Sequence, residues 1–494
     1  MPTGSPSPSS TCACVDRASC SGRVSRDRRT RGCSARCGMR SCSPSRARSP
    51  SSCGTAAMPQ RGRSCWPRSA STPTPSASGR EPRPVSEPPV RPPPSAVLMV
   101  SNTLPPFDLS GAGEQVVQLA SGLRSRGLRV EMLGRGAGGA RGPKLLFPLT
   151  VVWPALRLLR GGTFDVLQVH ESDGGLLILA VRLLRGLARR TGRGARWPVW
   201  LVALQQVTYV EEFRAVRTLR DGDSGAVLAR PTGAERAFRW LRAPLLTVLG
   251  WITARCADRV LVPSQQTARE VRRDYGARNV HVVPNTRAPQ AVRDAAAALR
   301  RGSSREGRES REDRESSAGR FLFVGRLRIR KGVEVLLAAL NEVPEARLDV
   351  LGDGERRREI ATRIERLGLT ERVRLLGRGS ADEVHQRLAE AIAVVVPSTY
   401  EGMPLVVLEA MECARPVVAS SVSGIPEVVV DGETGWLVAP ESPSQLAAAL
   451  RAVLADPVEA ERRGRAGRSR LDDRFRPQAA VDCWLAALAD PPRD

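Results

Sequence analysis

The sequence contains few aromatic residues and no long apolar run. Aromatic residues make up 4% of the 494 positions, and no basic strip is interleaved with them, which argues against a nucleic-acid partner. No apolar run reaches 18 residues, so no membrane-spanning helix is expected. Lysine and arginine outnumber acids by 76 to 51. This excess makes an anionic lipid surface or a phosphate-bearing acceptor plausible as a partner.

Residues 1–95 lack both a helical apolar stripe and an apolar run of the kind found in secretory signals. They hold eight of the eleven cysteines and 16 arginines against four acids, among many serines and prolines. A hydrophobic core cannot be built from this composition. The segment therefore stands apart from the rest of the chain.

Four interpretations of this head compete. A disulfide scaffold conflicts with the missing secretory signal, and the cysteine spacings at 12–14 and 33–37, without a nearby histidine, do not match zinc sites. The remaining two are a disordered basic tail and a translated upstream region. We expect the latter, with the true start at Met58 or near residue 90.

Lysine is scarce, and one of its two positions is informative. The chain has Lys144 and Lys331 only. Lys331 comes after an apolar strand within FLFVGRLRIRKG (321–332), five positions beyond Arg326. An ammonium suits a single phosphate oxygen, and a guanidinium offers a planar fork, so the pair could hold a diphosphate from two sides.

The segment PSTYEGMPLVVLEA (397–410) places Glu401 and Glu409 around a turn that opens an apolar helix. Pro404 suits the first helical position, where a missing N–H costs nothing. Free amides at such a helix start can bind an anion. The predicted phosphate-binding amides are those of Gly402, Met403, Leu405 and Val406.

The two acids are expected to serve different parts of one ligand. Glu409 lies ~7.5 Å further along the helix axis than the turn, at 1.5 Å per residue. A carboxylate accepts two hydrogen bonds side by side, which suits a vicinal diol such as a ribose. Surface acids on a capped helix are the simpler alternative, but Arg326 and Lys331 nearby favour the ligand site.

Together these segments resemble the retaining, GT-B-fold glycosyltransferases of family 4. Order and spacing fit over roughly 150 residues, and the joint pattern is specific although each piece alone is weak. The matching residues are Val324-Gly325-Arg326-Leu327, Lys331-Gly332, Leu351-Gly352-Asp353-Gly354, Val373 to Gly377, Pro397-Ser398, Glu401-Gly402, Pro404, Glu409-Ala410, Pro416 to Val418, Gly424 to Glu427, Asp431-Gly432 and Thr434-Gly435.

The resemblance implies an α/β fold with two Rossmann-like domains that face each other across a cleft. Length fits two domains of 150 to 200 residues plus extensions. The expected division is a head (1–95), an N-terminal acceptor domain (96–286), a polar linker (287–319), a C-terminal nucleotide-sugar domain (320–470) and a helix crossing back (471–494).

The N-terminal half opens with a βα unit of a parallel sheet. An apolar strand at 95–100 is followed by a glycine turn, a helix with apolar residues at helical spacing, and Gly127 as its stop. In the family this turn lies against the donor's phosphates. Gly111 matches the second glycine of the family's pair, whereas Ser110 departs from the first.

A strand over 166–169 delivers His170 to its carboxyl end, where open α/β sheets bind ligands. Family members carry a histidine there that contacts the reacting sugar, and many carry another where this chain has Gln168. Gln205 and Gln206 also stand where a histidine is frequent, while Asn285 matches the family. The alternative is that His170 is a structural residue at the strand end, with its hydrogen bonds made within the protein.

Two further patterns lack the context that would give them a function. The spacing Gly134, Gly136, Gly139 imitates a dinucleotide fingerprint, but no helix follows, so a loop is expected. Asp221-Gly222-Asp223 imitates a metal-binding motif, yet it lies in a polar loop and the family needs no metal for its chemistry. No metal or cofactor is expected besides the nucleotide-sugar co-substrate.

The predicted reaction is transfer of a sugar from a nucleoside diphosphate sugar to a glycan, lipid-linked or small-molecule acceptor, with retention of configuration. The diphosphate would lie on Arg326, Lys331 and the amides after Gly402, with Gly111 and Gly325 lining it. Glu409 would hold the ribose, and residues 373–378, beginning with Val373, the base. Glu401 and His170 would meet the sugar from opposite domains.

Two rival functions share the architecture: another GT-B enzyme, such as a sugar-nucleotide epimerase or a phosphorylase, and a non-catalytic scaffold at the membrane. The expected location is the cytoplasm, with peripheral contact at the inner face of the plasma membrane as an alternative. That alternative rests on apolar segments with basic flanks at 145–160 and 243–257. Packing of these helices on the first domain's sheet is the simpler interpretation.

Overall fold

The computed structural model describes residues 94–104, 111–135, 143, 146–191, 197–198, 200–286 and 319–489. Every described residue belongs to one compact unit, Cys65–Asp494. The predictions for the head, for Ser110, for Gly136 and Gly139, and for the linker before residue 319 lie outside the described residues.

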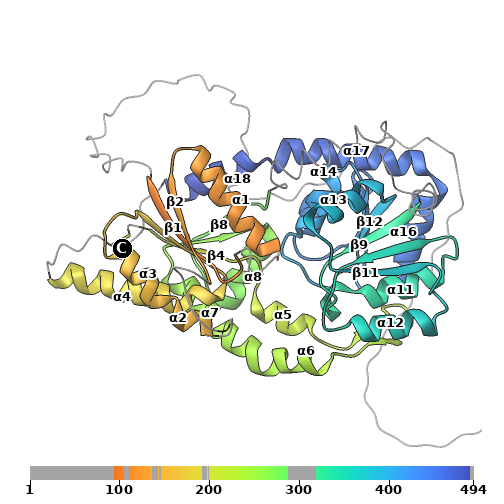
Figure 1. The fold of residues 1–494 in the computed structure, drawn as a ribbon, viewed down its shortest axis with the longest axis horizontal. Helices are drawn as coiled ribbons and strands as arrows, with labels where there is room; N and C mark the ends of the chain where they lie inside the picture. Colours follow the sequence, from red (N-terminus) through yellow and green to blue (C-terminus); the bar gives the residue numbers. More distant parts are fainter. Residues whose placement is uncertain are drawn as a thin grey trace, which may run out of the picture. The chain divides into compact units, whose positions relative to one another are not determined.

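The first domain is built on a six-stranded parallel sheet (Figure 1). Its strands are short apolar runs, as expected where both faces of a parallel sheet are covered. In spatial order they are β2 (Arg129–Leu133), β1 (Ala96–Val100), β3 (Val166–His170), β4 (Trp200–Leu204), β7 (Arg259–Val262) and β8 (Val280–Val282).

Helices cover both faces of this sheet. They are α1 (Gly111–Ser125), α2 (Phe147–Thr150), α3 (Val152–Leu159), η2 (Ser172–Gly174), α4 (Gly175–Thr191), α5 (Tyr209–Ala215), α6 (Gly233–Ala237), η3 (Phe238–Arg242), α7 (Ala243–Cys256) and α8 (Gln265–Tyr275). Strand β1 shows the two layers, because Val97 and Met99 pack on one side with α1, while Leu98 and Val100 pack on the other with α4.

The second domain repeats the plan. Its parallel strands, in spatial order, are β11 (Val373–Gly377), β10 (Arg347–Leu351), β9 (Arg320–Val324), β12 (Ala393–Val396), β13 (Val417–Ser420) and β14 (Gly435–Val438). Its helices are η4 (Ile329–Lys331), α11 (Val333–Asn341), α12 (Arg357–Arg366), α13 (Ala381–Glu390), α14 (Leu405–Glu412), α15 (Ile425–Val428) and α16 (Pro443–Ala455). The predicted pair of Rossmann-like domains is confirmed.

Both sheets have a topological switch point, where the strand order reverses. In the first sheet it lies between β1 and β3, and in the second between β9 and β12. Connections leave these neighbouring strands toward opposite faces, which opens a crevice at their carboxyl ends where ligands bind. Residues 101–111 and 170–175 follow one switch point, and residues 325–332 and 397–404 follow the other.

The last two helices lead from the second domain back to the first (blue in Figure 1). Helix α17 (Pro457–Arg474) packs on α14, and α18 (Pro477–Ala487) packs on α1. Trp484 of α18 is fully buried in the same core cluster as Val97 of β1. The end of the chain is therefore part of the first domain's core.

A small hairpin, β5 (Leu219–Arg220) with β6 (Val227–Ala229), precedes β7 in sequence but joins the core of the second domain. Leu219 and Leu228 are buried in the cluster that contains Phe321 of β9. The sequence alone did not indicate that this hairpin packs in the core of the second domain. It makes residues 216–242 a strap between the two domains.

Glu235 of α6 fixes this strap. One carboxylate oxygen accepts from the backbone N–H of Ile329 at 2.7 Å, and the other accepts from Arg356 at 3.0 Å and from Thr232 N–H at 2.9 Å. The side chains of Glu235 and Arg356 are both almost fully buried. A buried charge of this kind is tolerated only while it is paired.

Glu235→Ala should therefore lower the free energy of unfolding by about 1–3 kcal/mol, because the Ile329 amide loses its acceptor while Arg356 keeps its ion pair with Glu334 at 2.5 Å. Urea denaturation measures the change. Arg236→Ala, on the exposed face of the same helix, is the control and should stay within about 0.5 kcal/mol of wild type. Equal stability of the two variants would contradict the importance of this anchor.

Candidate functional site

Two loops at the switch point of the second sheet form the candidate site, and a glycine joins them. Gly332 has a φ of 67°, and a Cβ at this position would lie 2.0 Å from the carbonyl oxygen of Pro397. The amide of Thr399 donates to the Arg330 carbonyl at 2.8 Å. Only glycine combines this backbone conformation with so close an approach. The loop that carries Lys331 is thus held against the loop that carries Glu401.

Helix α14 begins one residue later than predicted. Pro404 has an extended backbone, with φ −71° and ψ 128°, and is the N-cap, so its assignment to the first helical position was wrong. The four predicted amides lie at this helix start. Among the described residues, the backbone N–H groups of Gly402, Met403, Leu405 and Val406 have no acceptor. These N–H groups at a helix N-terminus can receive an anion.

Lys331 and Glu401 form an ion pair inside this site. The Lys331 ammonium donates to Glu401 Oε1, which also accepts from the Ser398 hydroxyl at 2.7 Å. Glu401 is 6% exposed. Burial alone would raise the pKa of Glu401, but Lys331 and Arg330 together hold it below its usual range. Glu401 is therefore a carboxylate.

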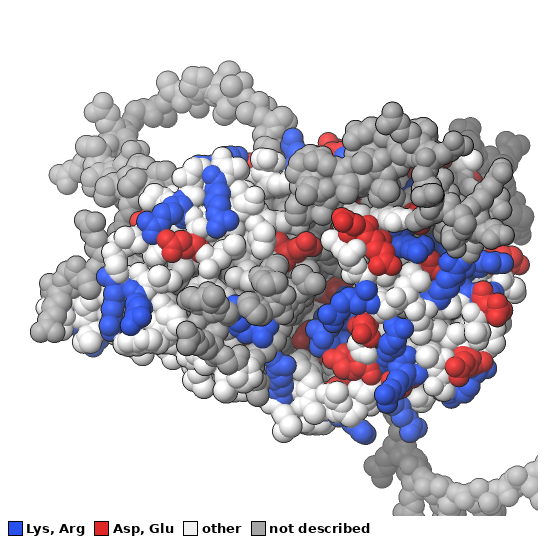
Figure 2. Space-filling model, viewed as in Figure 1, with Lys and Arg blue, Asp and Glu red and all other residues white. Residues whose placement is uncertain are grey.

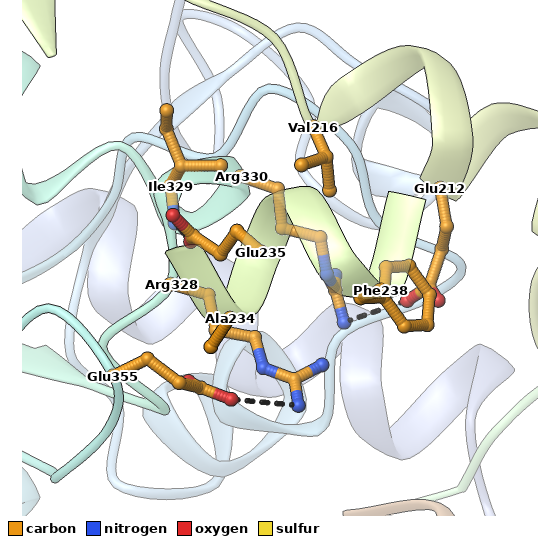
Figure 3. A pocket seen from close by; sticks show the side chains of 9 residues that line it. All are labelled: Glu212, Val216, Ala234, Glu235, Phe238, Arg328, Ile329, Arg330 and Glu355. Carbon is orange, nitrogen blue, oxygen red and sulfur yellow. Dashed lines mark hydrogen bonds and ion pairs between the residues drawn. The ribbon is translucent and has the colours of Figure 1, made fainter. Parts of the chain in front are cut away.

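Arg330 extends the pair into a chain of four charges, and the sequence analysis did not single it out. Its guanidinium lies 3.7 Å from Glu401 and 3.3 Å from Glu212 of α5, which belongs to the first domain. A small pocket lies next to this chain (Figure 3). Figure 3 shows the Arg330–Glu212 contact beside the Arg328–Glu355 pair, at 3.2 Å.

Glu409 lies on α14, five residues beyond Pro404, and is partly exposed. Burial raises its pKa to about 7, and the negative charge of Glu114 contributes. Glu114 stands in the first turn of α1, in the other domain. A Cβ on Gly111, at the start of the same helix, would lie 3.3 Å from the Leu405 side chain. The starts of α1 and α14 thus adjoin, and contact of Gly111 with the donor's phosphates stays a prediction.

The other predicted donor residues are only partly brought together. Gly325 follows β9, and its ideal Cβ position is 3.9 Å from the Lys331 side chain. Arg326 is exposed on the same loop. Val373 was predicted to line the base, but it opens β11, and its side chain is buried in the core. Because ligand-binding loops follow the carboxyl ends of strands, Gly377 and Arg378 are the better candidates.

Close contacts join the two domains beside this site. Asn285 donates to the Met403 carbonyl at 2.8 Å, and the Tyr400 hydroxyl accepts from Thr208 N–H at 3.0 Å. A Cβ on Gly402 would lie 2.1 Å from the Gln206 carbonyl oxygen. The site is therefore assembled from both domains, and Gly402 permits the approach.

His170 lies at the carboxyl end of β3, as predicted, and is 3% exposed. Burial lowers the pKa of its imidazole to about 3, so the ring is neutral at physiological pH. Its Nε2 lies 2.9 Å from the Gln168 amide nitrogen, while its Nδ1 has no partner among the described residues. A neutral imidazole with one unused nitrogen can hydrogen-bond a hydroxyl.

Glu171 is a residue that the sequence reasoning passed over. It adopts a φ of 59°, a strained conformation that non-glycine residues seldom take outside functional sites. Burial raises its pKa to about 8, with contributions from Glu212 and Asp173. The backbone N–H of Gln206 donates to the Glu171 carboxylate at 3.2 Å. Its place after His170 at a strand end was the only signal in the sequence.

Asp221 and Asp223 shape a turn of the hairpin. The Asp221 carboxylate accepts from Asp223 N–H at 2.8 Å and from Ser224 N–H at 3.2 Å. The Asp223 carboxylate accepts from Ser442 at 3.1 Å and also from Ser444. These contacts explain the Asp-Gly-Asp pattern as local structure.

Comparison with known proteins agrees with this geometry. Residues 109–287 match the model of the family "Glycosyltransferase Family 4", and residues 307–470 match "Glycosyl transferases group 1". A D-inositol 3-phosphate glycosyltransferase from Xylanimonas cellulosilytica is 30% identical over 390 residues, which cover 73% of this chain and 88% of that protein. A glycogen synthase from Mycobacterium tuberculosis is 28% identical over 416 residues, which cover 79% and 94%.

Solved structures share the fold. Sucrose-phosphate synthase from Thermosynechococcus elongatus superposes with a TM-score of 0.59 at 22% identity, covering 78% of this chain and 96% of that one. Anabaena HepE in complex with UDP-glucose gives a TM-score of 0.55 at 18% identity, covering 79% and 98%. On the sequence matches and the fold together, the chain belongs to the GT-B glycosyltransferases of family 4.

Proposed function

We propose that this protein transfers a hexose from a nucleoside diphosphate sugar to a glycan, lipid-linked or small-molecule acceptor, with retention of anomeric configuration. One observation carries the proposal: the amides at the start of α14, without acceptors among the described residues, adjoin Lys331 on one side and Glu409 on the other. This arrangement suits a diphosphate flanked by a ribose. The structure of Anabaena HepE in complex with UDP-glucose supports the donor class.

The leaving group determines the expected mechanism. As the glycosidic bond breaks, negative charge develops on the diphosphate, and donors already aimed at it stabilise that charge. Lys331, Arg326 and the α14 amides would supply this positive potential, and we therefore propose transfer without a metal ion. A diphosphate leaves at neutral pH without protonation, so Glu401 and Glu409 do not act as an acid and base pair of the glycosidase kind.

The remaining residues would orient the sugar. When the diphosphate draws the Lys331 ammonium toward itself, Glu401 is released from its ion pair and can accept hydrogen bonds from sugar hydroxyls. His170 would donate to another hydroxyl from the first domain. Glu171, beside it, would line the acceptor side. The two domains thus contribute opposite walls of one site, from which water is excluded during transfer.

Lys331→Ala should weaken nucleoside diphosphate binding by about tenfold to a hundredfold, because this factor corresponds to the free energy contributed by one hydrogen bond to a charged group. His170→Ala should leave this binding unchanged and lower turnover. Titration calorimetry and the release of free nucleoside diphosphate measure the two effects. Arg451→Ala, which removes one cation from an exposed pair, is the control. Unchanged affinity of the Lys331 variant would overturn the site assignment.

Because burial and Glu114 raise the pKa of Glu409 to about 7, donor affinity should depend on pH. The carboxylate accepts both hydrogen bonds of a diol, and the protonated acid does not. Affinity should therefore rise with pH up to about 7, by about tenfold per pH unit well below that value.

Glu409→Gln separates this effect from the titration of the ligand itself. The variant should bind more weakly and show only the pH dependence of the nucleotide, as measured by calorimetry in a series of buffers. A pH profile identical in shape to that of wild type would show that Glu409 does not contact the donor.

We further propose that the protein works in the cytoplasm, at the inner face of the plasma membrane. Cys256 forms no disulfide within the described part of the chain, which fits a reducing compartment. No helix in the described part of the chain is long and apolar enough to cross a membrane. Contact with lipid would therefore be peripheral.

The surface for this contact lies on α2, α3, α4, η3 and α7, where residues 146–160, 175–191 and 236–257 contain no acid. The inner faces of these helices pack in the core, as the simpler interpretation predicted, but their outer faces remain apolar.

The exposed apolar side chains of this surface are large. Those of Trp153, Leu183, Trp240 and Leu241 are 61–76% exposed. Arginines lie among them, and the face shown in Figure 2 displays groups of Arg on this domain with little acid. Apolar and basic side chains together suit anionic lipid.

Leu241→Glu should lower binding to vesicles that contain anionic lipid by about tenfold or more, the worth of burying one such side chain. Co-sedimentation with phosphatidylcholine vesicles, with and without phosphatidylglycerol, measures it. Val458→Glu is the matched control, because Val458 is 74% exposed on the second domain. Absence of vesicle binding by the unaltered chain would refute the membrane proposal and leave the glycosyl transfer untouched.

A further inference from the structure

Three buried polar side chains form a line that ends at His170. The indole N–H of Trp484, on α18, donates to Gln168 Oε1 at 2.6 Å. The side-chain nitrogen of Gln168 lies 2.9 Å from His170 Nε2. Trp484 and Gln168 are fully buried. The last helix of the chain therefore reaches, through one glutamine, a strand that lies 316 positions earlier in the sequence.

The chemistry of these groups fixes the direction of each hydrogen bond. An indole nitrogen can only donate, so the glutamine atom that faces it must be the carbonyl oxygen. The NH2 group of Gln168 then faces His170, and this group can only donate as well. His170 Nε2 must therefore accept, which places the proton of the neutral ring on Nδ1. A doubly protonated imidazolium would set two donors against each other.

The remaining nitrogen supports a role toward a ligand. His170 Nδ1 is buried and has no acceptor among the described residues. A buried donor without an acceptor is costly and uncommon. His170 ends β3 at the first sheet's switch point, where ligands bind. A sugar hydroxyl there would satisfy the Nδ1–H group. Burial also lowers the pKa of His170 to about 3, in agreement with a neutral ring.

We propose that Trp484 and Gln168 are positioning residues that hold His170 as the Nδ1–H tautomer, so that Nδ1–H is the donor presented to the sugar. The role of His170 toward the sugar rests on the proposed function. The tautomer itself does not, because it follows from contacts within the protein. Through α18, the folding of the chain's last helix onto the first domain becomes a condition for full activity.

Nuclear magnetic resonance of the full chain, labelled with 15N-histidine and without ligand, tests the tautomer directly. The chain has only three histidines, and His170→Asn identifies the signal of His170. Long-range 1H–15N correlations should show the proton on Nδ1. In Gln168→Glu, a carboxylate replaces the donor, so the proton should move to Nε2. In Trp484→Phe, the side-chain amide of Gln168 can flip, because no indole N–H fixes its orientation. Both tautomers of His170 should then appear.

Turnover should fall in variants in which His170 loses the Nδ1–H tautomer. Trp484→Phe should lower kcat by about tenfold, the rate equivalent of one hydrogen bond, while the KM for the donor stays unchanged. Val481→Ala is the matched control, because Val481 is buried on the same helix in the same core cluster. It loosens the packing of α18 without touching the three hydrogen-bonding groups, and it should keep the Nδ1–H tautomer and most of the turnover.

The proposal would be overturned by an Nε2–H signal in the unaltered chain, by a tautomer that persists in both Gln168→Glu and Trp484→Phe, or by an equal loss of turnover in Val481→Ala and Trp484→Phe. A shifted tautomer with unchanged turnover would also refute the role in transfer. Failure of the glycosyltransferase proposal would appear separately, as a lack of sugar transfer by a chain whose His170 has the expected tautomer.

Discussion

A chain of alternating charges, in which Glu212 and Glu401 are buried and Arg330 and Lys331 are half-buried, is the interaction on which the site depends. It is neutral in total, and it runs from the first domain into both loops of the second domain's switch point. Removing an inner member, Arg330 or Glu401, would leave an outer member of the chain without this partner, and a charge in the protein interior that loses its partner is costly. The chain therefore holds the two loops together, joins the domains, and keeps Lys331, the cation that we propose binds the donor's phosphates, in place before the donor binds.

The two domains contribute unequal parts. The second supplies amides, cations and Glu409, which are suited to a nucleotide, and the first supplies His170 and Glu171, which are suited to hydroxyl groups. This division follows from the duplicated architecture, because each sheet offers one switch point. The strap around Glu235 and the helix α18 cross between the domains, so that elements remote in sequence set the geometry where the two sheets meet.

The fold could be predicted from sequence, and residues for the donor side could be proposed, because their signals are local. Glycine turns, apolar strands and a helix start appear as short motifs in a fixed order. Arg330 was missed because the chain is rich in arginine, and only its contact with Glu212 distinguishes it. Glu171 was missed because a backbone strain leaves no mark in composition. Val373 was misplaced because a motif does not tell which end of a strand meets the ligand.

A structure with a nucleoside diphosphate bound tests the central claim most directly. The account predicts phosphate oxygens at the amides of Leu405 and Val406, the ribose diol on Glu409, and the Lys331 ammonium transferred from Glu401 to the phosphate. A nucleotide bound elsewhere, or a Lys331 that stays paired with Glu401 while the nucleotide is bound, would contradict it.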